Sequence, residues 1–308
     1  MDLLSRFRGS FLGLAVGDAL GAPVEFKPRG SFPPISGYRG GGPFNLKVGD
    51  WTDDTSLSLC LAESLVERRG FDPKDQAERY VRWWKEGHLS CTGNCFDIGN
   101  TTKWSLQRFL DTGEPYSGPA DPKKASNGSL MRLAPVPLFY HAHPVKAVDY
   151  SGLSSKTTHG ALSAVDSCRY FGALMVGTLA GESKENLISE NYEPTKGIWK
   201  KNPLTPEVAS IAMGSFKHLE PPEIKAEGTA VKTLEATLWA FNKTESFEEG
   251  CLLAVNLGDD SDTVGAVYGQ LAGAYYGVEG IPTKWKKGLS KSEMIKNLAE
   301  KLFNASSS

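Results

Sequence analysis

Two short acidic segments are the residues best suited to do chemistry. The first is Trp51-Thr52-Asp53-Asp54-Thr55 and the second is Gly258-Asp259-Asp260-Ser261-Asp262-Thr263. Each comes directly before a segment with helical periodicity, so its carboxylates fall in a loop or a first helical turn, where neighbouring side chains can converge on one point. Helix capping is an equal alternative for the first segment alone, but a cap needs only one side chain. Because crowded acids repel one another unless cations bridge them, the two segments together predict a metal site.

The type of ligand indicates the metal. Carboxylate and hydroxyl oxygens without histidine or thiolate suit Mg2+ or Mn2+. Four or five carboxylates exceed what one such ion uses, so we expect a binuclear site. Cys91 and Cys95 lie four residues apart, but no second pair of ligands completes a zinc site, and we expect them to pack a loop. The sequence has neither a Walker motif nor a dinucleotide-binding glycine motif, which argues against nucleotide hydrolysis and redox chemistry.

Two glycine stripes indicate the helices that must position these acids. Glycine recurs every fourth residue near the start, at Gly9, Gly13, Gly17 and Gly21, and again near the end, at Gly265, Gly269, Gly273 and Gly277. A glycine inside a helix costs about 1 kcal/mol relative to alanine, so close backbone packing must offset the loss. We therefore expect two tightly packed central helices, in contact with each other. The alternative is a coincidence in which some of these glycines cap or kink a helix.

The end of the first stripe carries two further carboxylates, Asp18 and Glu25. If the striped helices are neighbours, either carboxylate could approach the metal site. We interpret Asp18 as a solvated or hydrogen-bonded helix residue rather than a ligand, and Glu25 as a third contributor to the site.

The rest of the chain also has helical patterns and few strand signals. Helices are expected from about Ser56 and over 73–86, 101–110, 159–180, 206–217 and 231–241. Loops rich in proline and glycine are expected over 28–49, 111–127 and 182–203. No shift in composition marks a boundary, so the fold class is all-α, with residues 1–308 as one domain.

Composition limits the function classes. The 308 residues are 40% hydrophobic and 23% charged with a net charge of −2, which is ordinary for a globular protein and gives no reason to expect nucleic-acid or membrane binding. Five scattered cysteines fit a reducing compartment, and the first residues lack the pattern of a secretion signal. We expect a cytoplasmic protein.

The motifs as a set resemble one family, the ADP-ribosylglycohydrolases, which include dinitrogenase reductase-activating glycohydrolase and the ADP-ribosyl-acceptor hydrolases. The matching motifs occur in family order from residue 9 to about 285. They are Gly17-Asp18-Ala19-Leu20-Gly21 with Glu25, Thr52-Asp53-Asp54, Phe96-Asp97-Ile98-Gly99-Asn100, Asn127-Gly128-Ser129-Leu130-Met131-Arg132, Thr158-His159 and Asp260-Ser261-Asp262-Thr263. The resemblance implies an all-α fold and a cleft in which two Mg2+ or Mn2+ ions bind beside the distal ribose of ADP-ribose.

The resemblance also implies roles for single residues. The metal ligands it implies are Thr52, Asp53, Asp54, Asp260, Asp262 and Thr263, and the catalytic carboxylates are Glu25, Asp97, Asp54 and Asp260. The substrate-binding residues it implies are Asn100, Asn127, Gly128, Ser129, Met131 and His159. From the residues alone, Asp97 is equally a loop cap, Asn127-Gly128 is a turn signal in any protein, and His159 is a cap for a helix starting near Ala161.

The function implied is hydrolysis of the glycosidic bond between ADP-ribose and a modified protein side chain, most simply arginine. In this hypothesis the ions hold the ribose hydroxyls and lower the pKa of an attacking water, while Glu25 or Asp97 moves a proton. Partners would be an ADP-ribosylated protein and the product ADP-ribose, and the enzyme would be a monomer. Alternatives are serine-linked, poly- or O-acetyl-ADP-ribose, or a non-catalytic binder or crystallin-like protein. Asp259 and Thr229 depart from the family pattern, in which glycine and tyrosine are usual.

Overall fold

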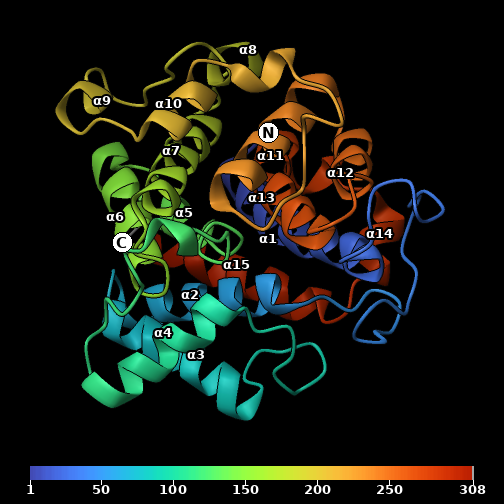
Figure 1. The fold of residues 1–308 in the computed structure, drawn as a ribbon, viewed down its shortest axis with the longest axis horizontal. Helices are drawn as coiled ribbons and strands as arrows, with labels where there is room; N and C mark the ends of the chain where they lie inside the picture. Colours follow the sequence, from blue (N-terminus) through green and yellow to red (C-terminus); the bar gives the residue numbers. More distant parts are fainter. Residues whose placement is uncertain (307–308) are drawn as a thin grey trace.

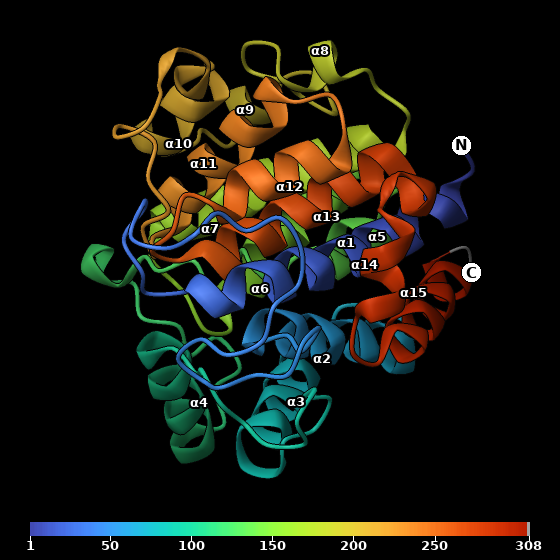
Figure 2. The ribbon, with the colours of Figure 1, turned by 90° about the vertical axis from the view of Figure 1, so that its right-hand side faces the viewer.

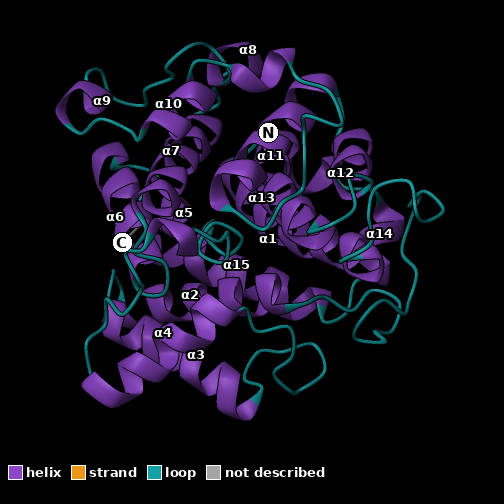
Figure 3. Ribbon diagram, viewed as in Figure 1, coloured by secondary structure: helices purple, strands orange, loops and turns teal. Residues whose placement is uncertain are grey.

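The computed structural model describes residues 1–306, and over this range the chain folds into helices joined by loops (Figures 1 and 3). Outside the helices, the β-structure described there is limited to two isolated bridges, Gly41 with Leu46 and Ser126 with Thr229. The all-α prediction is therefore confirmed. None of the helices in this range is long and apolar enough to cross a membrane.

The α-helices of residues 1–306 are α1 (Leu3–Gly21), α2 (Asp53–Arg68), α3 (Pro73–Glu86), α4 (Asn100–Thr112), α5 (Pro135–Phe139), α6 (Pro144–Lys156), α7 (Leu162–Leu179), α8 (Lys184–Leu187), α9 (Ile198–Lys201), α10 (Pro206–Ala212), α11 (Ala230–Lys243), α12 (Phe247–Val255), α13 (Ser261–Gly280), α14 (Thr283–Gly288) and α15 (Ser292–Ser306). Three 3-10 turns join them, namely η1 (Ala22–Val24), η2 (Pro122–Lys124) and η3 (Ser215–His218).

Helices α1 and α13 lie side by side at the centre, although they come from opposite ends of the chain (Figures 1 and 2). Their glycine stripes face each other in antiparallel order. A Cβ atom at Gly9 would overlap the backbone of Gly273, one at Gly13 would overlap Gly269, and one at Gly17 would overlap Gly265. The predicted contact is confirmed, because only glycine allows the two backbones to approach so closely.

The last glycine of each stripe has a different role. Gly21 ends α1, and a Cβ atom there would overlap the backbone of Asp262. Gly277 has φ +69° and breaks the regular geometry of α13. The alternative of a kink thus holds at one glycine only.

The other helices surround this pair. Helices α2, α3 and α4 lie on one side, while α8, α9 and α10 lie on the opposite side (Figure 1). Because neighbours cover α1 all round, apolar residues such as Phe7, Leu14 and Leu20 are buried along its whole length. Gln270 of α13 anchors the segment after Gly128, since its side chain accepts from Ala134 N at 2.8 Å and donates to Met131 O at 2.6 Å.

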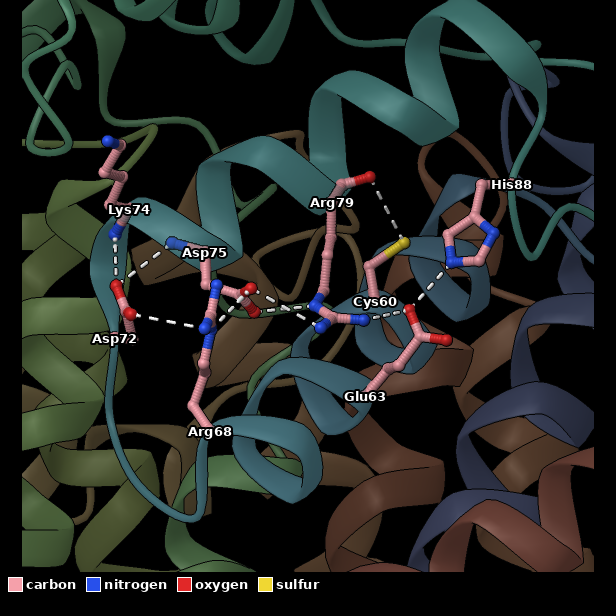
Figure 4. Close-up of polar contacts among 8 residues, drawn as sticks. All are labelled: Cys60, Glu63, Arg68, Asp72, Lys74, Asp75, Arg79 and His88. Atoms are coloured by element: carbon pink, nitrogen blue, oxygen red, sulfur yellow. Dashed lines mark hydrogen bonds and ion pairs between the residues drawn. The ribbon is translucent and has the colours of Figure 1, made fainter.

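An ionic network ties α2 to α3 (Figure 4). The guanidinium of Arg79 donates to Asp75 at 2.6 Å and also pairs with Glu63 of α2. Arg68 of α2 donates to Asp75 at 2.8 Å, and His88 lies 2.7 Å from Glu63. These contacts fix α3 against the helix that carries the first acidic segment.

Several expectations about the elements were inaccurate. The helix expected over 159–180 begins only at Leu162. Helix α2 begins at Asp53 rather than near Ser56, because the extended residue Thr52 precedes its first turn. The segment 206–217 is divided into α10 and η3 by Gly214, whose φ is +91°. The expected loop 182–203 contains the short helices α8 and α9.

Replacing Gly269 tests the central contact. We expect Gly269→Ala to lower the free energy of unfolding by about 3 kcal/mol or more, because the added methyl overlaps backbone atoms of Gly13 that have no room to move. Urea denaturation measures the change. Gly37→Ala is the control, because its Cβ atom would meet its nearest neighbour, Trp285 Nε1, at an ordinary 3.8 Å. Equal stability of the two variants would contradict the packing described here.

Candidate active site

The two acidic segments converge at the adjoining ends of the central helices. Asp53 and Asp54 are in the first turn of α2, and Asp262 is in the first turn of α13. The hydroxyl oxygen of Thr52 lies 3.2 Å from Asp54 Oδ2 and 3.5 Å from Asp262 Oδ2. Side chains 210 positions apart in the sequence therefore share one site.

Two more carboxylates complete the cluster. Glu25 directly follows the turn η1 at the end of α1, and Asp97 lies in the loop before α4 with φ +60°. Carboxylate oxygens of Glu25, Asp97 and Asp262 all lie within 4.8 Å of one another. Glu25 is 5% exposed and Asp262 is 1% exposed. Such a group of oxygens is the ligand set that a hard divalent ion uses.

A cavity of about 470 Å³ opens above the cluster. Most of the expected site residues line it: Glu25, Asp53, Asp54, Asp97, Asn100, Asn127, Gly128, Met131, His159, Asp260, Asp262 and Thr263. The structure does not bring two expected residues to the cavity wall. Thr52 and Ser129 are both buried. The hydroxyl of Thr52 contacts the carboxylate of Asp54, and the hydroxyl of Ser129 lies 2.8 Å from Ser155 Oγ.

Burial and mutual repulsion make ionisation of these acids costly. Burial, with the nearby charges of Asp97 and Asp260, raises the pKa of Glu25 to about 10. Burial also raises the pKa of Asp97 to about 8, and the pKa values of Asp54 and Asp262 lie well above their usual range for the same reasons. Neither lysine nor arginine is among the lining residues. The site therefore lacks a protein cation that would favour the charged forms.

Unpaired oxygens show that the site fits a cation. Within residues 1–306, three buried carboxylate oxygens have no hydrogen-bond partner, namely Glu25 Oε2, Asp54 Oδ1 and Asp262 Oδ1. Buried polar atoms in native proteins are nearly always paired, so these oxygens are open to a proton or to a ligand from outside the chain. A divalent cation would supply both the missing contact and the missing positive charge.

Asp18 holds the start of α2, which carries two of the cluster carboxylates, by hydrogen bonds. Its carboxylate is fully buried and accepts from Thr52 N at 2.9 Å, from Thr55 N at 3.1 Å and from Thr55 Oγ1 at 2.6 Å. These bonds fix the start of α2 and so hold the tight turn that presents Asp53 and Asp54. Of the two roles expected for Asp18 in its helix, the hydrogen-bonded one is confirmed and the solvated one is wrong, because the side chain is fully buried.

The capping alternatives do not hold at Asp97 and His159, whereas the turn expected at Asn127-Gly128 is present, because Leu130 N donates to Asn127 O at 2.8 Å. The residue before α4 is Gly99, which has no capping side chain, and Asp97 lines the cavity. Helix α7 begins after Ala161 without a side-chain cap, while His159 contacts Thr158 Oγ1 at 2.8 Å and Ser126 Oγ at 2.9 Å. Asn127 Nδ2 donates to Asp260 Oδ2 at 2.7 Å, so it orients a cluster carboxylate.

Several lining residues were not anticipated from the sequence: Phe26, Gly99, Thr101, Thr102, Ser126 and Gly228. All of them except Gly228 lie inside a motif or within two residues of one, which was the only available signal.

The two departures from the family pattern, Asp259 and Thr229, affect local backbone structure only. Asp259 adopts φ +49°, a conformation that favours glycine, and Thr229 caps α11 by accepting from Lys232 N at 3.3 Å.

These features agree with what comparison with known proteins shows. The ADP-ribosylglycohydrolase family model matches residues 1–308, and the chain belongs to this family of hydrolases. It is 39% identical to ADP-ribosylarginine hydrolase Tri1 of Serratia proteamaculans over 98% of this chain and 80% of that protein. It is 32% identical to ADP-ribosyl-[dinitrogen reductase] glycohydrolase of Rhodospirillum rubrum, over 94% of this chain and 90% of that protein. A solved structure described as an ADP-ribosylglycohydrolase-related protein complex is 46% identical, with TM-score 0.87 and 99% of both chains covered.

The raised pKa values predict how pH affects the metal-free protein. The pKa of Asp97 rises from 3.8 to about 8 in the folded chain, so between these values the folded state binds more protons than the unfolded state. Stability of chelated protein should therefore fall as pH rises from about 5 to 8. We expect Mn2+ to reverse the fall. Thermal unfolding with EDTA and with Mn2+ measures both effects, and a midpoint that rises with pH in EDTA would contradict the assignment.

Proposed function

We propose that this protein hydrolyses the bond between ADP-ribose and the side chain of arginine in modified proteins. The observation that carries the proposal is the convergence at one cavity of buried, unpaired carboxylates from the residue after η1 and from the first turns of α2 and α13, in a chain whose relatives include named ADP-ribosylarginine hydrolases. The cavity volume of about 470 Å³ suits part of a nucleotide-sized ligand.

Two divalent ions, Mg2+ or Mn2+, would bind among the oxygens of Thr52, Asp53, Asp54, Asp260, Asp262 and Thr263. The number of carboxylates supports two ions, because one Mg2+ or Mn2+ usually takes one or two carboxylates and keeps several waters. Glu25 is close enough to Asp262 to contribute as well. When bound, such ions polarise ligand oxygens and lower the pKa of a nearby water.

The protein's own residues would then orient the substrate and move the proton. Glu25 and Asp97 share a hydrogen bond, and their raised pKa values allow one of them to hold a proton near neutral pH. That proton can pass to the departing guanidine nitrogen. Asn127 keeps Asp260 in place, and buried carbon atoms of Met131 limit access of water to this wall.

Backbone amides offer a place for the phosphates. Helix α4 begins at Asn100 on the cavity wall, and Lys103 N is the first amide that bonds within the helix. The amides of residues 100–102 are thus available to an anion at the positive end of the helix dipole. The Asn127-Gly128-Ser129 segment would line the same part of the cleft.

We also propose that residues 1–308 act as one domain and as a cytoplasmic monomer on ADP-ribosylated proteins. The central pair of helices from opposite ends of the chain supports a single domain. The cysteines at 60, 91, 95, 168 and 251 are all free, which suits a reducing compartment.

Peptides carrying ADP-ribose on arginine or on serine test the reaction. We expect purified protein to release ADP-ribose from the arginine peptide with Mg2+ or Mn2+ and to lose this activity in EDTA. Asp54→Asn and Asp262→Asn should lower kcat by roughly a hundredfold or more, because each removes a charge at the reacting centre. Asp259→Asn is the matched control, since Asp259 is exposed and does not line this cavity.

The assay also separates the alternatives. Release from the serine peptide alone would overturn the arginine assignment while leaving the hydrolase intact. Absence of release from either peptide, with metal bound, would indicate a non-catalytic ADP-ribose binder and overturn the proposal.

A further inference from the structure

Arg132 is a buried cation without a carboxylate partner. Its side chain is fully buried, and none of the ion pairs within residues 1–306 includes it. Nη1 donates to Gly128 O at 3.0 Å, Nη2 donates to Thr157 Oγ1 at 3.1 Å and Thr158 Oγ1 at 2.7 Å, and the guanidinium lies 4.5 Å from the Tyr80 ring centre. An arginine can only donate hydrogen bonds, so each oxygen that it contacts must accept.

Because Arg132 can only donate, it also determines the direction of the hydrogen bond between Thr158 and His159. Thr158 Oγ1 accepts from Arg132, and its own proton has a single acceptor within reach in the described chain, Nδ1 of His159 at 2.8 Å. The opposite arrangement would leave a hydroxyl proton unpaired at a fully buried position, which is costly. Nδ1 therefore accepts, and the imidazole carries its proton on Nε2.

The same direction of donation continues from His159 to the residues that line the cavity. With its proton on Nε2, His159 donates to Ser126 Oγ at 2.9 Å, and Ser126 Oγ donates to Thr101 Oγ1 at 3.3 Å. Ser126 and Thr101 both line the cavity. Within residues 1–306 the Thr101 hydroxyl has no acceptor for its own proton, so the chain of bonds ends in an O–H donor at the cavity wall.

We propose that Arg132 is a positioning residue that holds His159 as the Nε2–H tautomer and so makes this wall of the cavity a hydrogen-bond donor to a substrate oxygen. The assignment of the tautomer stands on the hydrogen bonds alone. Its role toward substrate rests on the proposed function, in which ADP-ribose supplies ribose and phosphate oxygens as acceptors.

Packing around the imidazole holds the ring in this orientation. A Cβ atom at Gly128 would lie 2.9 Å from His159 Cε1 and 3.1 Å from Nε2, so the ring is tightly covered on that side. Turning the ring over would place carbon atoms against Thr158 and Ser126 and lose both bonds. Burial and the charge of Arg132 lower the pKa of His159 to about 3, which keeps the imidazole neutral at pH 7.

Nitrogen NMR tests the tautomer without reference to activity. In full-length protein with 15N-labelled histidine, long-range 1H–15N spectra at pH 7 should show His159 with a protonated Nε2 and a bare Nδ1. The spectrum of His159→Gln identifies the signals among the five histidines. A protonated Nδ1, or a charged ring, would overturn the proposal.

Thr158→Val tests the role of the link, because it keeps Arg132 and its charge. We expect this variant to show a mixed or reversed His159 tautomer and a roughly tenfold lower kcat/KM for the arginine-linked peptide, the effect of losing one oriented hydrogen bond. Thr158→Ser should restore both readouts.

Thr157→Val is the matched control. Thr157 also accepts from Arg132, but its proton goes to Ser154 O at 2.8 Å and does not reach His159. We expect an unchanged tautomer and unchanged kcat/KM. If both variants lowered activity equally with the tautomer intact, Arg132 would have only a structural role. If the tautomer holds as expected but no arginine peptide is cleaved, the proposed function fails and the tautomer assignment stands.

Discussion

The backbone contact between α1 and α13 is the constraint on which the site depends. The glycines pair in antiparallel order. Successive contacts therefore run toward the carboxyl end of α1 and toward the amino end of α13. The last contact places Gly21, at the end of α1, against Asp262, in the first turn of α13. Glu25 follows four residues after Gly21, and so the register of the glycines decides which carboxylates meet. A shift of one turn would separate Glu25 from Asp262 by about 5 Å along the helix axis.

This register gathers acids that repel one another, and the surrounding structure holds them together. Asp18 uses its carboxylate to bind the start of α2, and Asn127 uses its amide to bind Asp260. Neither contact neutralises charge. The cost is met by protons in the metal-free protein and by divalent ions in the form that we propose to be active. The same repulsion that makes the apo site hard to ionise would favour the divalent ions that we propose to bind there.

The sequence allowed the central helices and both acidic segments to be predicted. Glycine at every fourth residue is unfavourable in a helix unless two backbones touch, and aspartates repeated at a helix start exceed what a cap requires. The sequence evidence for Asp97 and His159 as site residues was weaker. A cap or a turn accounts for either residue locally, and only long-range packing brings both to the cavity. Thr101 and Ser126 gave no signal beyond their place next to a motif, since a hydroxyl side chain beside a helix start is ordinary. Their importance comes from the direction of a hydrogen-bond chain that begins at Arg132.

The cavity thus has two walls of opposite character. On one side, buried oxygens of Glu25, Asp54 and Asp262 accept and have no partner within residues 1–306, so this wall requires a cation or a proton. On the other side, the bonds from Arg132 through His159 run toward the cavity and end in a donor, which requires an oxygen atom. A ligand that satisfies both walls must bring oxygens that can face cations on one side and accept hydrogen bonds on the other. Ribose hydroxyls and phosphates meet both demands, whereas an apolar ligand meets neither.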